Sequence, residues 1–303
     1  MRRPIHNLIV LLFATFIAFY TVLFAIAPNL SYVSAAESDI SEVVTLGANL
    51  SQSQQNQMFD IFGVSQDDSE VKILKVTNQE EREYLQGLVP DKQIGSKAIS
   101  CVYVKILEGG GGIDVKTKNI SFVTEQAYAN ALVTAKIQDA RVYAAAPFPV
   151  SGTAALTGLF KAYEEATGED ISEEAKKVAT EELVTTGEIG EETGEKEAVS
   201  ELLSRVKERV VEENLKDPEE IRKVVEDVAG DMDIDLTPDQ VEKIVGLMEK
   251  IARLDLDIGT LRTQLEDVRS KLKEFLGGKK SQSAWQQVLD FFSDLWSKIN
   301  SYF

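Results

Sequence analysis

Histidine and cysteine are almost absent from this sequence of 303 residues, which contains only His6 and Cys101 of these two types. His6 lies in the apolar N-terminal segment, so the rest of the chain carries no imidazole group. This absence excludes Ser-His-Asp and Cys-His catalysis, histidine-ligated zinc and general-base chemistry by histidine. Carboxylate chemistry, serine paired with lysine, and calcium held by oxygen ligands remain open.

The single cysteine also limits how the chain is cross-linked and anchored. Cys101 has no partner within the chain, so no internal disulfide forms. The alternating run AISCVYVKIL around it predicts a buried structural thiol. No cysteine follows the apolar N-terminal segment, as a lipoprotein anchor requires, and no LPxTG-like sorting motif stands near the C-terminus. We therefore expect secretion without covalent anchoring.

Residues 1–36 have the composition of a secretory signal peptide. Two arginines precede the apolar run Leu8–Ala27, and Ala35 and Ala36 provide small residues for cleavage. The apolar run, of about 20 residues, is also long enough to span a bilayer. We expect a cleaved leader and a protein that is extracellular or loosely associated with the cell envelope. An uncleaved N-terminal membrane anchor is the alternative.

Acidic residues strongly outnumber basic ones, with 50 Asp and Glu against 32 Lys and Arg. The predicted leader holds two of the basic residues and no acidic ones, so the rest of the chain carries a formal charge of −20. Nucleic acid is excluded as a partner, because binding it requires Lys and Arg to neutralise phosphates. We expect a partner protein or a cell-envelope component, with membrane contact only through the N-terminal segment or the C-terminal helix.

Strand and helix patterns predict a small mixed α/β domain over residues 37–165. The runs VKILKV, SCVYVKIL, GIDVKTKNI and ARVYAAAPF are typical of strands, and Gly109–Gly112 between the second and third predict a hairpin. Thr77, followed by Glu80, and Thr124 are expected to cap helices between strands. Strand–helix–strand passages of this kind indicate a small sheet with helices packed on it.

Residues 166–276 predict an acidic all-helical domain of about four amphipathic helices. Ser172, Asp217 and Thr237 are the expected N-caps, and one long amphipathic helix is expected from Thr237 to Leu276. Residues 277–303 predict a GGKKSQS linker and a C-terminal amphipathic helix. The predicted fold class is therefore α+β.

The stretch PFPVSGTAALTG joins the last predicted strand to a helix, the plan on which nucleophilic serines and phosphate-binding loops are built. Pro149 and Thr153 stand where a nucleophile elbow has glycines, and the lysine of a phosphate loop is missing. Ser151 or Thr153 is expected to cap the helix. The alternative is a ligand site at Ser151, Gly152 and Thr153, where free N–H groups hold an anion or a carbonyl.

The stretch DMDIDLTPDQVE places carboxylates at positions 1, 3, 5 and 12 of an EF-hand-like loop. These four residues are Asp231, Asp233, Asp235 and Glu242. The loop lacks the turn glycine, and Leu236 stands in its place. We expect a short extended segment and no cofactor, and calcium at the four carboxylates is the alternative.

The end of the chain concentrates aromatic residues on one face of the predicted C-terminal helix. Five residues at helical spacing represent this partner or membrane surface: Trp285, Leu289, Phe292, Trp296 and Ile299. The polar face of the helix is not basic, unlike that of helices that bind anionic lipid. Docking against the helical domain or a partner protein is therefore favoured over docking against a membrane.

Four long stretches resemble one protein family. VTNQEEREYLQG, IGSKAISCVYVKIL, GIDVKTKNISFVTEQAYANALVTA and VYAAAPFPVSGTAALTGLFKAYEEATG are similar to the YpuA-like family of secreted Gram-positive proteins, a domain of unknown function (DUF1002). The helical half is similar as well, so the resemblance covers nearly all of the chain after the leader. It implies secretion and brings no catalytic residues.

These observations predict a secreted, non-enzymatic protein associated with the cell envelope, which binds a partner protein or a surface ligand. The alternative is an envelope hydrolase or transferase that uses carboxylate or serine chemistry at the Ser151–Thr153 turn. A pocket converging on Ser151 with a buried Lys or Glu supports the alternative. A turn whose hydroxyls only cap the helix argues against it.

Overall fold

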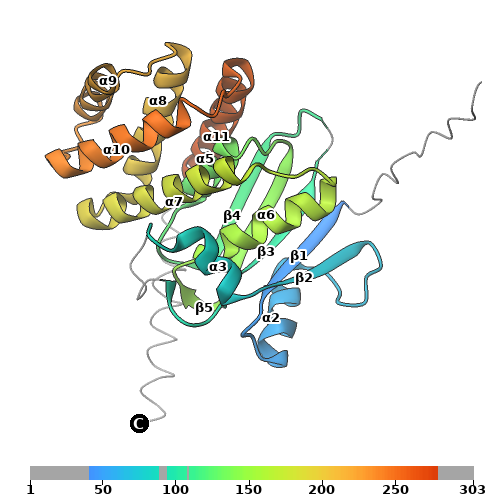
Figure 1. Ribbon diagram of the computed structural model, residues 1–303. Coiled ribbons are helices and arrows are strands. Elements are labelled where there is room, and N and C mark those ends of the chain that lie inside the picture. The colour runs from blue at the N-terminus through green and yellow to red at the C-terminus, as the bar shows by residue number, and fades with distance from the viewer. Residues whose placement is uncertain (1–40, 89–93, 108, 279–303) are drawn as a thin grey trace, which may run out of the picture. The chain divides into compact units, whose positions relative to one another are not determined.

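The structure, a computed structural model, describes residues 41–88, 94–107 and 109–278. These residues form a five-stranded mixed sheet, helices packed against it, and a run of helices that follows it along the chain (Figure 1). The α+β fold class is confirmed. All described residues belong to one compact unit. The domain boundary near residue 165 stays a prediction.

The sheet mixes parallel and antiparallel pairs in the order β2-β1-β3-β5-β4. Its strands are β1 (Glu42–Gly47), β2 (Val71–Val76), β3 (Cys101–Ile106), β4 (Ile113–Ile120) and β5 (Ala140–Val150). β1–β2 and β4–β5 are parallel, whereas β3 is antiparallel to both β1 and β5. The predicted hairpin between β3 and β4 is therefore wrong, because β5 lies between them.

Side-chain burial explains why β5, and not β4, is an interior strand of the sheet. Ala144 and Ala145 project to opposite faces of β5 and both are fully buried. A strand buried on both faces suits the middle of a sheet. β4 exposes Lys116 and Lys118, and lysines of this kind protect an edge strand from further pairing. The burial of β5 and the exposed lysines of β4 thus explain why β5 pairs with β3 and β4 lies at the edge of the sheet.

Different helices cover the two faces of the sheet. α5 (Glu125–Thr134) and α6 (Thr153–Thr167) pack in the cluster on one face, and α2 (Gln52–Phe62) packs in the cluster on the other. Cys101 lies on the α2 side beside Val44 and is fully buried, which confirms the predicted structural thiol. Burial raises the pKa of Cys101 to about 12, so its thiol stays protonated.

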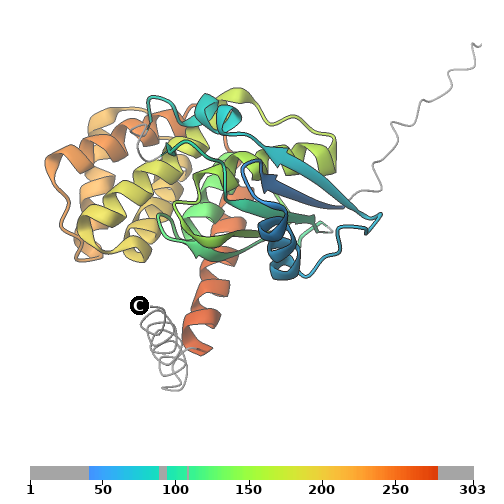
Figure 2. The ribbon, with the colours of Figure 1, turned by 90° about the horizontal axis from the view of Figure 1, so that it is seen from below.

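The helices α7 (Glu173–Thr193), α8 (Lys196–Glu212), α9 (Pro218–Asp231) and α10 (Pro238–Ile251) gather to one side of the sheet in both Figure 1 and Figure 2. The helix α11 (Ile258–Gly278) follows them and contacts α5, α8 and β4. The prediction of a single helix from Thr237 to Leu276 is wrong, because a loop interrupts the helix between α10 and α11. Leu254 turns into the core there, Asp255 takes a left-handed φ of 51°, and Asp257 then accepts a hydrogen bond from the Thr260 N–H.

Five of the expected helix caps are confirmed. Each cap side chain accepts a hydrogen bond from a backbone N–H two or three residues further along, as Ser, Thr and Asp caps do. These caps are Thr77, Thr124, Ser172, Asp217 and Thr237. Thr77 and Thr237 begin complete capping boxes with Glu80 and Gln240.

One hydrophobic core extends from the sheet into the following helices through α5, which contacts α7, α8 and α11. At this junction Lys207 of α8 and Glu182 of α7 are fully buried and form an ion pair of 2.8 Å. Lys207 Nζ also donates to the Asn130 carbonyl at 2.8 Å and to the Thr134 hydroxyl at 3.0 Å, both on α5. All three ammonium protons therefore have acceptors.

Two predictions lie outside the described residues. They are the leader at residues 1–36 and the aromatic surface of the C-terminal helix, with Trp285, Leu289, Phe292, Trp296 and Ile299. Within the described ranges, none of the helices combines the length and the apolar composition that crossing a membrane requires.

Candidate functional site

The β5–α6 turn connects the sheet to α6 without a side-chain cap. Gly152 is the N-cap residue of α6 and takes a left-handed φ of 97°. A Cβ atom at this position would lie 2.5 Å from Cγ2 of Ile120 and 2.8 Å from the hydroxyl oxygen of Tyr128, so only glycine fits. The expected cap by Ser151 or Thr153 is wrong, because no side chain caps this helix.

Thr153 instead directs its hydroxyl to a buried carboxyl group. Its Oγ1 lies 2.7 Å from Oε1 of Glu81 in α3 (Asn78–Leu85), and Glu81 is only 2% exposed. The other carboxyl oxygen of Glu81 accepts a hydrogen bond of 3.2 Å from Asn78 Nδ2. Burial raises the pKa of Glu81 above its ordinary value, although the hydrogen bonds from Thr153 and Asn78 oppose the shift.

Ser151 continues this chain of hydrogen bonds toward the surface. Its Oγ lies 3.2 Å from Oγ1 of Thr153, and Ser151 is half-buried. Thr153 has one hydroxyl proton, and an ionised Glu81 accepts it, so Ser151 is the donor to Thr153. The lone pairs of Ser151 Oγ are then available to a ligand.

A cavity of about 160 Å³ opens at the turn. Its lining residues are Ser121, Phe122, Ser151, Thr153 and Glu191. Lys196 lies beside it, with Nζ 2.5 Å from the Ser121 carbonyl oxygen and 3.3 Å from Glu191 Oε1. Sites that enclose a whole small molecule occupy roughly 300–1,000 Å³. This cavity therefore accommodates one small group of a larger ligand.

Tyr128 of α5 holds the turn from inside the protein. Its hydroxyl donates a hydrogen bond of 2.5 Å to the carbonyl oxygen of Gly152. Tyr128 is fully buried, and burial raises the pKa of its hydroxyl, which stays protonated as a donor. The backbone between Ser151 and Thr153 is thus fixed by the left-handed glycine and by this bond.

The structure does not bring the four calcium candidates together. Asp231 ends α9, Asp233 takes a left-handed φ of 53°, and Asp235 is exposed in the loop before α10. Glu242 projects from α10 and forms an ion pair with Arg222. Among the residues of the described ranges, no group of three His, Cys, Asp or Glu side chains is arranged to hold a metal ion.

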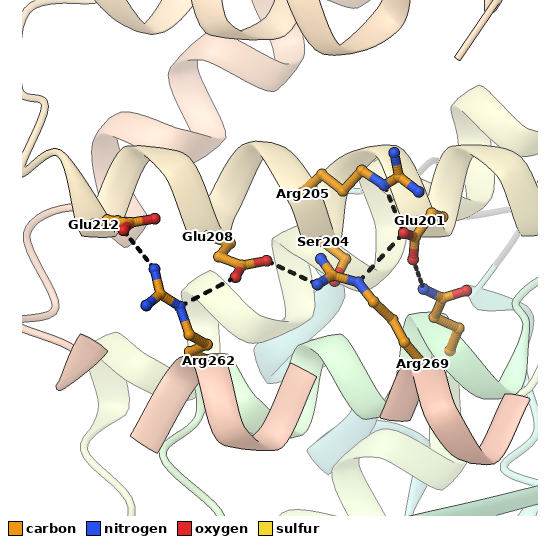
Figure 3. Close-up of polar contacts among 8 residues, drawn as sticks. Glu201, Ser204, Arg205, Glu208, Glu212, Arg262 and Arg269 are labelled. Carbon is orange, nitrogen blue, oxygen red and sulfur yellow. Dashed lines mark hydrogen bonds and ion pairs between the residues drawn. The ribbon is translucent and has the colours of Figure 1, made fainter. Parts of the chain in front are cut away.

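A ladder of alternating charges joins α8 to α11 (Figure 3). Arg269 of α11 lies between Glu201 and Glu208 of α8, with nitrogen–oxygen distances of 3.3 and 2.8 Å. Arg262 continues the ladder to Glu208 at 3.6 Å and also pairs with Glu212. Each arginine thus bridges two carboxylates. The ladder holds α11 in place and leaves no unpaired charge for a ligand among these residues.

A larger groove, of about 710 Å³, lies between the glycine turn after β3 and the start of α11. Asp139 on its wall accepts hydrogen bonds from the N–H groups of Gly110 and Gly112, at 3.1 and 2.8 Å. Asp257 accepts the Thr260 N–H at 2.7 Å. Because these carboxylates hold loops in place, the groove is a weaker candidate than the β5–α6 turn.

Sequence reasoning identified Ser151, Gly152 and Thr153 but missed Glu81. A signal for Glu81 exists: it stands four residues before Leu85 in a short helix, and Leu85 is buried on the same face. The charge ladder was missed as well. Its signal is the spacing of seven residues between Glu201 and Glu208, repeated by its arginines, which places both partners on one helix face.

Comparisons with known proteins agree with the resemblance seen in the sequence. The family described as "Protein of unknown function (DUF1002)" matches residues 46–268. The chain is 41% identical over 283 residues to "Uncharacterized protein YpuA" of Bacillus subtilis (strain 168), which covers 93% of this chain and 96% of the relative. No solved structure matches the chain significantly. The matched region contains the β5–α6 turn and Glu81, and the chain belongs to the DUF1002 family.

Proposed function

We propose that this protein is secreted, stays associated with the cell envelope, and binds an envelope component through the cavity at the β5–α6 turn. The observation that carries the proposal is the inward hydrogen bond from Thr153 to Glu81. It leaves the start of α6 without a side-chain cap at a cavity lined by Ser151. The first N–H groups of a helix lack intrahelical acceptors, so they are available to a ligand oxygen.

The charges around the cavity favour a neutral ligand group over an anion. Glu191 lines the cavity and Glu81 lies one hydrogen bond behind it, and Lys196 beside the cavity balances only one of these two carboxylates. A carbonyl oxygen fits the N–H groups of α6, and a ligand N–H group fits the carboxylate of Glu191. An amide supplies both within the available space. Peptides and N-acetylated sugars, which carry such amides, are therefore the ligand class that we propose.

A titration with a matched pair of sugars tests this assignment. N-acetylglucosamine oligomers are expected to shift the backbone amide NMR signals of Gly152, Thr153 and Ala154 to saturation, while glucosamine oligomers of equal length are not. Ser151→Ala is expected to weaken binding about tenfold, the equivalent of one hydrogen bond. Ser53→Ala, at an exposed position of α2, is the control that keeps full affinity. Equal shifts with both sugars would contradict the amide assignment.

Secretion is proposed from the composition of residues 1–36 and tested separately. Expression of the full chain in a Gram-positive host, followed by mass spectrometry of the medium and membrane fractions, gives the mature N-terminus. Cleavage after Ala35 or Ala36 supports the secreted form. A membrane-bound product that begins at residue 1 supports the uncleaved anchor instead.

The aromatic residues of the C-terminal segment are proposed as a protein-docking surface. Flotation of the mature protein, with and without residues 281–303, on anionic and on zwitterionic vesicles tests the membrane alternative. Absence of flotation with both vesicle types leaves protein docking. Flotation that disappears with the deletion assigns the segment to the membrane.

A further inference from the structure

We propose that the cavity at the β5–α6 turn is also an acyl-transfer site, with Ser151 as nucleophile, Thr153 as proton relay and Glu81 as proton acceptor. The inference rests on the proposed function in one respect, that the cavity receives a carbonyl group. It goes beyond binding because it assigns a covalent step to the same residues. The substrate class is a carboxylic ester or amide.

In other serine enzymes a histidine accepts the proton of the nucleophilic serine, and here a hydroxyl and a buried carboxyl group take that role. A nucleophilic serine needs a base within hydrogen-bond reach and a further group that orients the base. Here Ser151 reaches the base through one hydroxyl, at 3.2 Å to Thr153 and then 2.7 Å to Glu81. Asn78 orients the carboxyl group from its other oxygen, at 3.2 Å. Ser151 and Thr153 come from the β5–α6 turn, and Glu81 and Asn78 come from α3.

Protons and bonds balance along this chain. Ser151 Oγ attacks the carbonyl carbon while its proton passes to Thr153 Oγ1 and the Thr153 proton passes to Glu81 Oε1. The tetrahedral intermediate collapses, the carbon–nitrogen or carbon–oxygen bond breaks, and the leaving group takes the proton back through Thr153. Water then attacks the acyl-Ser151 ester, releases its proton along the same path, and Ser151 Oγ leaves and is reprotonated. Water is the only co-reactant.

The turn also places donors where negative charge develops. The cavity that holds Ser151 lies at the uncapped start of α6. Backbone N–H groups at such a position stabilise an oxyanion without reorganising during the reaction. The left-handed Gly152 and the bond from Tyr128 to its carbonyl keep this backbone rigid. A fixed donor set is the property that distinguishes an oxyanion site from a flexible loop.

The environment of Glu81 favours its role as proton acceptor. Burial raises its pKa, which makes its carboxylate a stronger base than an exposed one. The titratable groups that act on it are Arg82 on its own helix and Tyr128 on α5. α6 faces it with the neutral Thr153 hydroxyl, and α7 packs the apolar Val184 against the same helix.

A fluorophosphonate probe tests the assignment, because it reacts with activated serines and needs no envelope ligand. The mature protein is incubated with the probe from pH 5 to 9, and peptide mass spectrometry locates the adduct. We expect one adduct, at Ser151, with a rate that rises with pH as Glu81 ionises. Ser151→Ala is expected to abolish the adduct, and Ser53→Ala to leave it unchanged.

Glu81→Gln separates proton transfer from structure, because glutamine keeps an oxygen that accepts the Thr153 hydroxyl. It is expected to slow labelling about a hundredfold or more and to flatten the pH profile. Thr153→Ser is expected to retain most of the rate and Thr153→Val to lose it, with thermal unfolding as the check on folding. No adduct at Ser151 in the wild type, or equal rates and pH profiles for wild type and Glu81→Gln, overturns the proposal.

The sugar titration and the probe fail independently. Amide-dependent binding without a Ser151 adduct leaves the proposed function in place and removes the acyl-transfer step. A Ser151 adduct without amide-dependent binding keeps the reactive serine and removes the envelope amide as its ligand.

Discussion

Replacement of Lys207 by methionine is expected to destabilise the protein by about 3–5 kcal/mol, because it leaves the fully buried Glu182 without its counter-ion. Methionine fills nearly the volume of the lysine stem, so the cavity contribution is small. The loss comes from the 2.8 Å ion pair and from the Asn130 carbonyl and Thr134 hydroxyl, which lose a donor. Among the described residues, the hydrogen bond from Thr134 then remains to Glu182.

The double variant Lys207→Met with Glu182→Gln distinguishes the charge effect from lost packing. It leaves no buried charge, and the glutamine oxygen still accepts the Thr134 hydroxyl. We expect it to be more stable than the sum of the single variants implies, with a coupling free energy of about 2 kcal/mol or more. Urea unfolding of the four proteins of this cycle, followed by circular dichroism, measures the coupling. A loss below about 1 kcal/mol for Lys207→Met at pH 7, or single-variant losses that simply add in the double variant, would refute the reasoning.

Three further changes test the site and its support by thermal or urea unfolding. Gly152→Ala is expected to cost about 2 kcal/mol or more, from the left-handed φ and the contact with Ile120, while Gly246→Ala in α10, where a Cβ meets open space, is expected to gain about 0.5–1 kcal/mol. Equal effects of the two would contradict the geometry of the turn. Glu81→Gln is expected to gain stability relative to the wild type as pH rises above about 4.3, the unfolded pKa of glutamate, because the raised pKa of Glu81 makes wild-type stability fall as pH rises. A difference that does not change with pH would argue against a buried charge. Arg269→Met is expected to cost about 1 kcal/mol at low salt and less at 1 M salt, because the ladder is partly exposed. A salt-independent loss would assign the effect to packing.

Helix starts were predictable because their interactions are local. Thr77, Ser172 and Thr237 each bind a backbone N–H three residues further along, so residue type and spacing decide the outcome. Thr153 has the same residue type at the same kind of position, yet it does not cap α6. Its hydroxyl proton goes to Glu81, which is 72 residues away in the sequence, and no local pattern encodes that partner.

The prediction that β3 and β4 pair as a hairpin was wrong for a related reason. A glycine-rich connection between two strand patterns predicts a hairpin, because turn chemistry is read over a few residues. The structure pairs β3 with β5 instead, in register from Cys101 with Ala145 to Ile106 with Ala140. Burial on both faces of β5 decides this pairing, and burial is a property of the assembled layers rather than of the turn.

The sequence by itself determined the chemistry that is absent from the chain after the leader, the α+β class and the positions of the caps, since composition and local periodicity carry this information. It also marked Ser151, Gly152 and Thr153 as a candidate site. Only the tertiary structure decided that Glu81 lies behind Thr153 and that Lys207 meets Glu182 in one shared core. Periodicity shows which face of a helix is buried, but the partners of buried polar groups depend on how the helices pack.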